Sequence, residues 1–193
     1  MSNVVDIGCG TRKMKGSIGM DIVPVAGVDV VASLARGLPF KDNSLDAVYA
    51  YHILEHVDDF LAAMGEIWRV CRHGAKAYVK VPHASSPYMT WKDPTHRRGL
   101  SIATFAYFDD TYFDGIAFSY YSPARFRIEK AKLNFTLTDR KVTPDLSPMR
   151  RILNPMLEAV ANRSRGWQYA AERFWGPIVG IEEAVLTLRA IKE

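Results

Sequence analysis

The stretch Val4-Val5-Asp6-Ile7-Gly8-Cys9-Gly10 carries the strongest fold signal in the chain. Its first four residues are mostly β-branched and predict a short buried strand. The glycines that follow allow a tight loop in which the backbone can approach a ligand closely. In open α/β sheets, ligands bind at the carboxyl ends of the strands. The stretch therefore predicts the first strand of such a sheet, with a binding loop at its end.

Further strands alternate with helices or loops along the chain. We expect these strands over residues 17–22, 28–31, 45–51 and 75–81. The apolar spacing after Asp58 predicts one amphipathic helix, which begins at that residue and runs to about Cys71. Gly74 stands where a helix stop is expected. This order predicts an α/β fold with a Rossmann-like, doubly wound and mostly parallel sheet.

The second half of the chain is less regular. Residues 83–123 predict long loops with short helices, and loops of this length usually serve function. Residues 126–138 predict a strand or a hairpin, and the alternation over 183–191 predicts a closing strand. Residues 139–181 then form a helical insertion, which could cover the active site as a lid, form a homodimer face or contact a membrane surface. We expect a single domain over residues 1–193.

Composition excludes several classes of protein. The chain has 193 residues, of which 48% are apolar and 24% charged, as in ordinary globular proteins. The net charge of +4 is spread along the chain, so we expect no nucleic-acid partner. No apolar run is long enough for a transmembrane segment, and the N-terminus does not resemble a signal peptide. Cys9 and Cys71 cannot form a disulfide framework or a cysteine zinc site, which suits a cytoplasmic location.

A second carboxylate ends the next expected strand. Asp21 follows Asp6 by 15 residues, and it is well placed to accept hydrogen bonds from both ribose hydroxyls of a nucleoside. The glycine loop reads D-x-G-x-G, with Lys13 where the dinucleotide fingerprint needs a third glycine. The pattern therefore favours a nucleoside cofactor without a pyrophosphate over NAD.

Three more segments follow in a characteristic order. They are Leu38-Pro39-Phe40-Lys41-Asp42-Asn43-Ser44-Leu45-Asp46, Leu54-Glu55-His56-Val57 and Glu66-Ile67-Trp68-Arg69-Val70. With the glycine loop and Gly19-Met20-Asp21, this order resembles the class I S-adenosylmethionine-dependent methyltransferases, in particular the small type 11 group. The resemblance covers residues 4–82, and the closing strand is similar to that family's last, antiparallel strand. It implies S-adenosylmethionine as the cofactor and methyl transfer to an unidentified small-molecule acceptor.

The resemblance also implies which residues hold the cofactor. Gly8, Cys9 and Gly10 would contact its methionine part through their backbone. Asp6 would hold the ammonium group, through water, and Asp21 would bind the ribose diol.

The adenine and the methyl acceptor would meet a second set of residues. Ile22 would cover one face of the adenine, and Ser33 and Leu34 would lie near its edge. Tyr51 and His52 would close over the methionine and face the acceptor.

The chain departs from the family pattern at two places. Ser33 stands where the family usually has an acid that recognises the adenine amino group. The loop over residues 11–16 leaves little room for the usual helix between the first two strands. These departures support an alternative function, a non-catalytic cofactor-binding or scaffold protein with the methyltransferase fold.

Histidines are the candidate catalytic bases, because methyl transfer to a hydroxyl or amine is helped by a base with a pKa near neutral. His52, His83 and His96 are the candidates, and a network that only stabilises the loops is the alternative for the last two. His52-Ile53-Leu54-Glu55-His56 also matches the H-x-x-E-H pattern of some zinc hydrolases. That pattern needs a long helix, whereas here it follows a strand, so we expect no metal.

Overall fold

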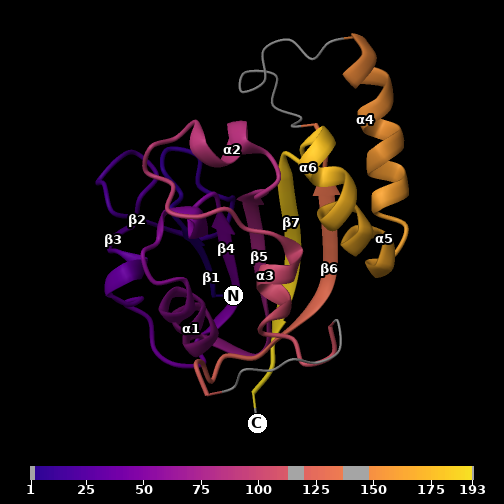
Figure 1. Ribbon diagram of the computed structural model, residues 1–193. Coiled ribbons are helices and arrows are strands. Elements are labelled where there is room, and N and C mark those ends of the chain that lie inside the picture. Colours follow the sequence, from indigo (N-terminus) through magenta and orange to yellow (C-terminus); the bar gives the residue numbers. More distant parts are fainter. Residues whose placement is uncertain (1–2, 113–119, 137–147, 193) are drawn as a thin grey trace.

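The computed structural model describes residues 3–112, 120–136 and 148–192 (Figure 1). Its sheet has the strand order β3-β2-β1-β4-β5-β7-β6. The strands are β1 (Val4–Ile7), β2 (Ile18–Asp21), β3 (Val30–Val31), β4 (Leu45–Tyr51), β5 (Cys71–Pro82), β6 (Phe126–Asn134) and β7 (Glu183–Ala190). Strands β1 to β5 pair in parallel, and β7 is antiparallel to both β5 and β6. The mostly parallel sheet with an antiparallel closing strand is therefore confirmed.

The helices are short apart from two. They are η1 (Leu34–Arg36), η2 (Leu54–His56), α1 (Phe60–Val70), α2 (Pro87–Trp91), α3 (Ile102–Ala106), α4 (Pro148–Ala161), α5 (Arg165–Ala170), the π-helical turn η4 (Ala171–Trp175) and α6 (Gly176–Val179). Helices α1 and α3 lie in front of the sheet, and α4 to α6 lie beside β6 and β7 (Figure 1). The described part of the insertion, residues 148–181, is helical as expected, while residues 139–147 lie outside the described residues.

The first long helix differs from the sequence prediction at both ends. Asp59, and not Asp58, caps α1, because its Oδ1 accepts a hydrogen bond of 2.9 Å from the amide of Ala62. The helix ends at Val70 and β5 begins at once with Cys71. Gly74 therefore lies inside β5, with a φ of +79°, where the register against β4 shifts. The prediction that it stops the helix is wrong.

Helix α1 packs on the sheet through one apolar face. The buried side chains of this face include Phe60, Met64 and Ile67, as the sequence predicts, and also Ala63 and Val70. They join a continuous core that extends from Val5 in β1 to Ala190 in β7. Full burial of a large apolar side chain contributes about 1.5–3 kcal/mol, so this face alone fixes the helix on the sheet.

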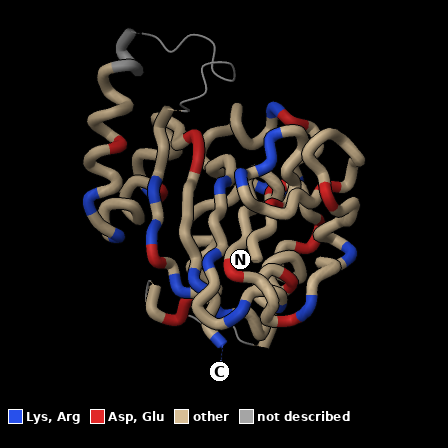
Figure 2. The backbone as a smooth tube through the Cα atoms, turned by 180° about the vertical axis from the view of Figure 1, so that it is seen from behind, with Lys and Arg blue, Asp and Glu red and all other residues tan. Residues whose placement is uncertain are grey.

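No helix connects β1 to β2 or β2 to β3, since residues 8–17 and 22–29 form turns and extended segments. The shortened connection that the sequence predicts is thus observed. Seen from behind, the sheet shows its other face, with acidic and basic residues interspersed along the backbone (Figure 2). On the sheet the Tyr49 and Tyr78 rings stack with their centroids 4.9 Å apart, and the Lys80 ammonium lies 4.5 Å from the centroid of the Tyr51 ring. These rings shield the strands where a helix would otherwise pack.

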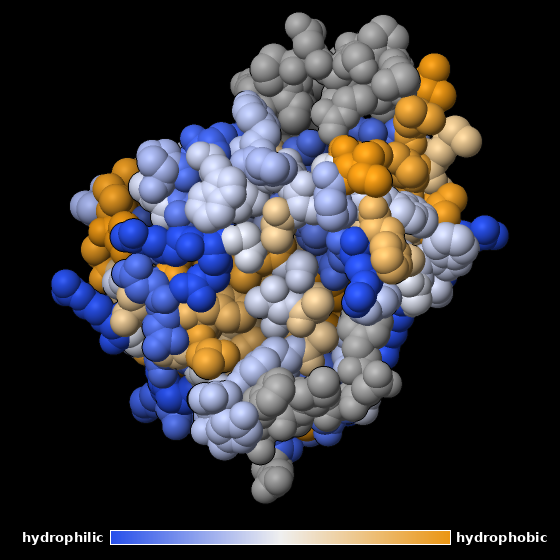
Figure 3. All heavy atoms as spheres, in the orientation of Figure 1, coloured by the Kyte–Doolittle hydropathy of each residue, from blue (hydrophilic) through white to orange (hydrophobic). Residues whose placement is uncertain are grey.

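Exposed apolar side chains gather on the insertion. On α4 the exposed fractions are 67% for Ile152, 43% for Leu153 and 62% for Met156. Figure 3 shows hydrophobic surface over this helix and, on the opposite flank, over the β2–β3 region. Among the described residues, no helix is both long enough and apolar enough to cross a membrane.

Candidate functional site

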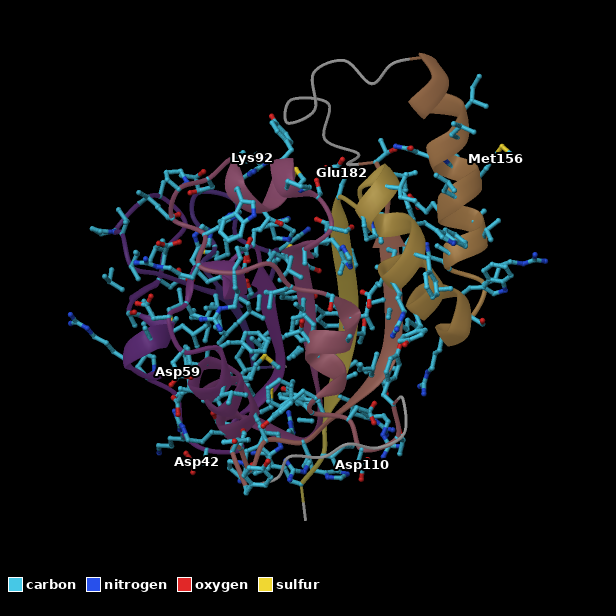
Figure 4. The ribbon with its side chains drawn as sticks, viewed as in Figure 1. Asp42, Asp59, Lys92, Asp110, Met156 and Glu182 are labelled. Atoms are coloured by element: carbon cyan, nitrogen blue, oxygen red, sulfur yellow. The ribbon has the colours of Figure 1, made fainter. Side chains whose placement is uncertain are left out.

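The expected site residues meet at one edge of the sheet. Because β1, β2, β4 and β5 are parallel, their carboxyl ends share this edge, where Gly8, Asp21, His52 and His83 follow the strands. The strand order reverses between β1 and β4, which is where open α/β sheets bind ligands. In Figure 4 this is the upper edge, near Lys92 and Glu182, whereas Asp42 and Asp110 lie at the opposite edge.

The glycine loop after β1 is held in a left-handed conformation. The amides of Gly8 and Cys9 donate to the carbonyl of Met20, at 2.8 and 3.2 Å. Gly8 and Gly10 have φ values of +69° and +50°, a region that side chains other than glycine rarely adopt. A Cβ atom on Gly8 would lie 3.0 Å from Cδ1 of Ile53, whereas a Cβ atom on Gly10 would enter open space. The loop thus packs on one side and leaves the Gly10 backbone open to a ligand.

Asp21 binds the glycine loop, and Asp6 binds the segment that follows it. The amide of Gly10 donates to Oδ2 of Asp21 at 2.9 Å, and the amide of Val23 donates to Oδ1 at 3.1 Å. Each Asp21 oxygen keeps further acceptor capacity, which a diol could use. Asp6 is buried and accepts a hydrogen bond of 2.8 Å from the amide of Met14. Burial raises the pKa of Asp6, and the hydrogen bond from Met14 opposes that shift.

The flank of the site is made by the loops over residues 11–16 and 22–29, whose contact the sequence does not predict. Lys13 forms an ion pair of 2.7 Å with Asp29, whose carboxylate also accepts a hydrogen bond of 2.7 Å from the amide of Gly19. A Cβ atom on Gly19 would lie 2.5 Å from the carbonyl oxygen of Gly27, so only glycine fits there. The loop over 11–16 is therefore anchored on the loop over 22–29.

Some of the residues that we expect near the adenine are exposed, and others are buried. Ile22 is 66% exposed next to Asp21, and Val31 at the end of β3 is 59% exposed. An exposed apolar pair beside a carboxylate can bind a flat ring. Leu34, in contrast, packs in the core at 5% exposure, and Ser33 precedes η1 without a capping side-chain hydrogen bond. The Leu34 side chain therefore contributes to the core rather than to a ligand surface.

Two of the sequence segments prove to have a structural role. Arg69 of α1 donates to the carbonyls of Leu38 and Phe40, at 2.9 and 3.0 Å, and binds both oxygens of Glu66. The amide of Leu38 in turn donates to Glu66 at 2.8 Å. These bonds fasten the chain before β4 to the helix after it, and they lie outside the ligand edge.

His52 follows β4 directly and has a strained conformation. Its φ of +54° lies in the left-handed region, and its amide donates to the carbonyl of Lys80 at 2.8 Å. Its Nε2 lies 3.0 Å from Oε1 of Glu183, the first residue of β7. Burial alone would lower the pKa of His52, but the nearby carboxylates of Glu183 and Glu55 raise it to about 9. An imidazole that holds its proton at neutral pH suits electrostatic positioning better than proton removal.

His83 is locked between two elements. Its Nδ1 accepts a hydrogen bond of 3.1 Å from the amide of Ser85, and its Nε2 lies 3.0 Å from Oε1 of Glu172 in the insertion. The side chain is 2% exposed. Both ring nitrogens are therefore engaged, and His83 serves to join the end of β5 to the insertion.

His96 meets His56 and Glu55, a set that no local sequence pattern reveals. Its Nε2 lies 4.0 Å from Oε1 of Glu55, beyond hydrogen-bond distance, and its ring packs edge-on against His56 with the centroids 4.7 Å apart. Forty residues separate His56 from His96, so only the fold brings them together.

Comparisons with known proteins agree with this geometry. Residues 5–79 match the family described as a methyltransferase domain, a range that contains the glycine loop, Asp21 and His52. No curated protein matches the chain by sequence.

Solved structures share the fold over nearly the whole chain. One is a SAM-dependent methyltransferase from Archaeoglobus fulgidus, with a TM-score of 0.59 and 17% identity over 97% of this chain and 86% of that chain. Another is an S-adenosylmethionine-dependent methyltransferase from Mesorhizobium loti, with a TM-score of 0.54 and 15% identity over 97% of this chain and 90% of that chain. A third belongs to the complex between the Haloferax volcanii Trm112 methyltransferase activator and a methyltransferase. Its TM-score is 0.59, with 17% identity over 99% of this chain and 83% of that chain. At these identities the likeness shows the fold.

Proposed function

We propose that this chain is a class I S-adenosylmethionine-dependent methyltransferase, which binds S-adenosylmethionine as its cofactor and transfers the methyl group to a small-molecule acceptor. The observation that carries the proposal is the open glycine loop bound to Asp21. The Gly10 amide donates to Oδ2 of Asp21 at 2.9 Å, and the space beyond the Gly10 Cα atom is open.

The residues at this edge fit the chemistry of that cofactor. Asp21 keeps acceptor capacity on both oxygens for the ribose hydroxyls. Asp6 places a negative charge beneath the loop, where an ammonium group is favoured. Ile22 offers an exposed apolar surface to an adenine face. We propose that these residues, with Gly8, Cys9 and Gly10, hold the cofactor.

When bound, S-adenosylmethionine supplies a methyl group already activated by its sulfonium. The protein therefore has to align the acceptor and exclude water, and alignment alone can supply a large part of the barrier lowering. Tyr51 and His52 end β4 beside the glycine loop, and Ile53 packs against Gly8. We propose that this segment positions the acceptor, with the charge of His52 fixed by Glu183.

A non-catalytic cofactor-binding protein is the second candidate function. Ser33 forms no capping hydrogen bond through its side chain and stands where the family usually has an acid. The interactions of His83 also leave no ring nitrogen for proton removal. These features favour binding of the cofactor without turnover.

The test is transfer of label from methyl-labelled S-adenosylmethionine to a panel of small hydroxyl, amine and thiol compounds. We expect one acceptor class to take up label, and Asp21→Asn to reduce transfer by at least about tenfold, since a hydrogen bond to a charged group contributes about 1.5–3 kcal/mol. Asp110→Asn is the matched control, because Asp110 is 61% exposed in a surface pair with Arg127. Cofactor binding without label transfer to any compound would overturn methyl transfer in favour of the second candidate.

A further inference from the structure

We propose that Glu55, His56 and His96 form a binding site for a divalent transition-metal ion of the zinc type. One ligand atom from each of these side chains lies within 4.8 Å of the other two. Glu55 and His56 come from η2, directly after β4, and His96 comes from the loop after α2. The proposal rests on the placement of these side chains and on the hydrogen bonds that orient them, and it is independent of methyl transfer.

The ring of His96 is oriented with its Nε2 atom toward Glu55. Its Nδ1 lies 2.7 Å from the carbonyl oxygen of Thr90, and a carbonyl can only accept, so Nδ1 carries the hydrogen. In the neutral imidazole, Nε2 is then an acceptor. This Nε2 lies 4.0 Å from Oε1 of Glu55. Two electron-rich atoms therefore face each other across a gap too long for a hydrogen bond.

His56 is oriented in the same way through a relay. The hydroxyl of Thr95 donates to Oδ1 of Asp93 at 2.6 Å, so its oxygen is left to accept a hydrogen bond from Nδ1 of His56 at 2.9 Å. The nitrogen left to bind an ion is Nε2. Histidines that bind metals almost always donate their other N–H to a carboxylate, carbonyl or water in this manner. His56 and His96 thus both have the outer hydrogen bond that such ligands need.

Glu55 supplies the unbalanced charge. Its side chain is 1% exposed, and neither carboxylate oxygen has a hydrogen-bond partner among the described residues. A buried carboxylate that accepts no hydrogen bond is unfavourable. The cationic group on its other side, His52, lies 3.5 Å from Oε1 and is shared with Glu183. A cation between Glu55 and the two Nε2 atoms would satisfy all three groups at once.

The donor set indicates the kind of ion. Two imidazole nitrogens and one carboxylate oxygen suit zinc and its neighbours rather than magnesium or calcium, which prefer oxygen ligands. Three protein ligands leave a position of a four-coordinate ion for water or another oxygen ligand. This proposal departs from our expectation, drawn from the sequence, that the chain binds no metal. The ligand set keeps Glu55 and His56 of the H-x-x-E-H pattern, but His96 takes the place of His52.

The test uses the full chain, stripped with a chelator and titrated with Co²⁺ and with Zn²⁺. We expect one ion per chain, a visible cobalt absorption band, and a rise in Tm with Zn²⁺, since a ligand that binds the native state stabilises it. His96→Ala and Glu55→Gln should weaken binding by more than about 100-fold, and Thr95→Val by about 10–100-fold, as for loss of an outer partner. His73→Ala is the matched control, because His73 is exposed at the other end of β5 beside Lys192.

Two outcomes would overturn the site. One is native wild-type protein that gives neither stoichiometric binding nor a cobalt band. The other is an equal loss of affinity in His73→Ala and His96→Ala. Binding of S-adenosylhomocysteine in the same samples separates this proposal from the methyltransferase one, because the two can fail independently.

Discussion

The amide of Gly10 donates a hydrogen bond of 2.9 Å to Oδ2 of Asp21, and so joins the loop after β1 to the end of β2. The two elements that would hold opposite halves of the cofactor are therefore fixed to each other before it binds. Such preorganisation reduces the entropy lost on binding. The relationship also explains why a carboxylate is needed at Asp21 even without a ligand.

Gly10→Ala should weaken cofactor binding beyond what its effect on the free energy of unfolding explains. A residue with a Cβ atom in the left-handed region costs about 1–2 kcal/mol, and the Cβ would enter the open space beside the loop. Gly74→Ala is the matched control, because Gly74 has a φ of +79° and equally open surroundings. We expect similar losses in urea denaturation for the two variants, and at least tenfold weaker S-adenosylhomocysteine binding for Gly10→Ala alone. Equal affinities would contradict the role of the loop.

Arg69→Met should destabilise the protein by about 2–3 kcal/mol at pH 7, because buried and charged hydrogen-bond partners are left unsatisfied. The hydrogen bond from Arg69 holds the pKa of Glu66 below its usual range, although burial opposes this. A lowered pKa contributes stability above the unfolded value of about 4.3 that is lost as the pH falls through the folded value. Urea denaturation of both proteins from pH 7 to pH 3 should therefore show the stability gap narrowing below about pH 4. A difference in unfolding free energy that stays constant with pH would contradict the pairing of Arg69 with Glu66.

His83→Ala should affect stability rather than turnover. The imidazole is 2% exposed and hydrogen-bonded to Glu172, whose Oε1 also accepts a hydrogen bond of 2.6 Å from the amide of Ile102. Removing a buried partner of a charged group costs at least about 1–3 kcal/mol. We expect a lower Tm and faster proteolysis in the insertion, with label transfer retained at low temperature. Loss of methyl transfer in a variant that keeps the wild-type Tm would instead support His83 as the catalytic base.

The two cysteines should be poorly reactive in the native protein. Burial raises the pKa of Cys71 to about 12, and burial with the charges of Asp6 and Asp21 raises the pKa of Cys9. Because the thiolate is the reactive form, alkylation at pH 8 should be slow until the chain unfolds. Mass spectrometry after iodoacetamide treatment, with and without urea, measures this. Rapid native labelling of Cys71 would contradict its place in the core.

Local patterns predicted the sheet well and the side-chain clusters poorly. The run from Val4 to Gly10 and the apolar face of α1 depend on neighbouring residues, so the sequence alone indicates them. Parallel strands then bring Gly8, Asp21 and His52 to one edge without further information. The end of α1 was placed wrongly because the helix passes directly into β5, and the glycine beyond it serves a register shift instead.

The clusters arise from contacts between distant segments. Glu172 lies in the insertion yet binds His83, and His96 approaches Glu55 only because the loop after α2 folds back over η2. Neither pair of residues is part of a periodic pattern or a characteristic spacing in the sequence. The same reason explains why His52 was expected as a base, since the partner that raises its pKa, Glu183, comes from the last strand.

Calorimetric titration with S-adenosylhomocysteine tests the central claim most directly. Wild-type protein with a verified native fold should bind one equivalent, and Asp21→Asn should bind at least about tenfold more weakly, while Asp110→Asn should match the wild type. The absence of binding heat from both S-adenosylhomocysteine and S-adenosylmethionine at millimolar concentration, or equal affinity in wild type and Asp21→Asn, would contradict the account.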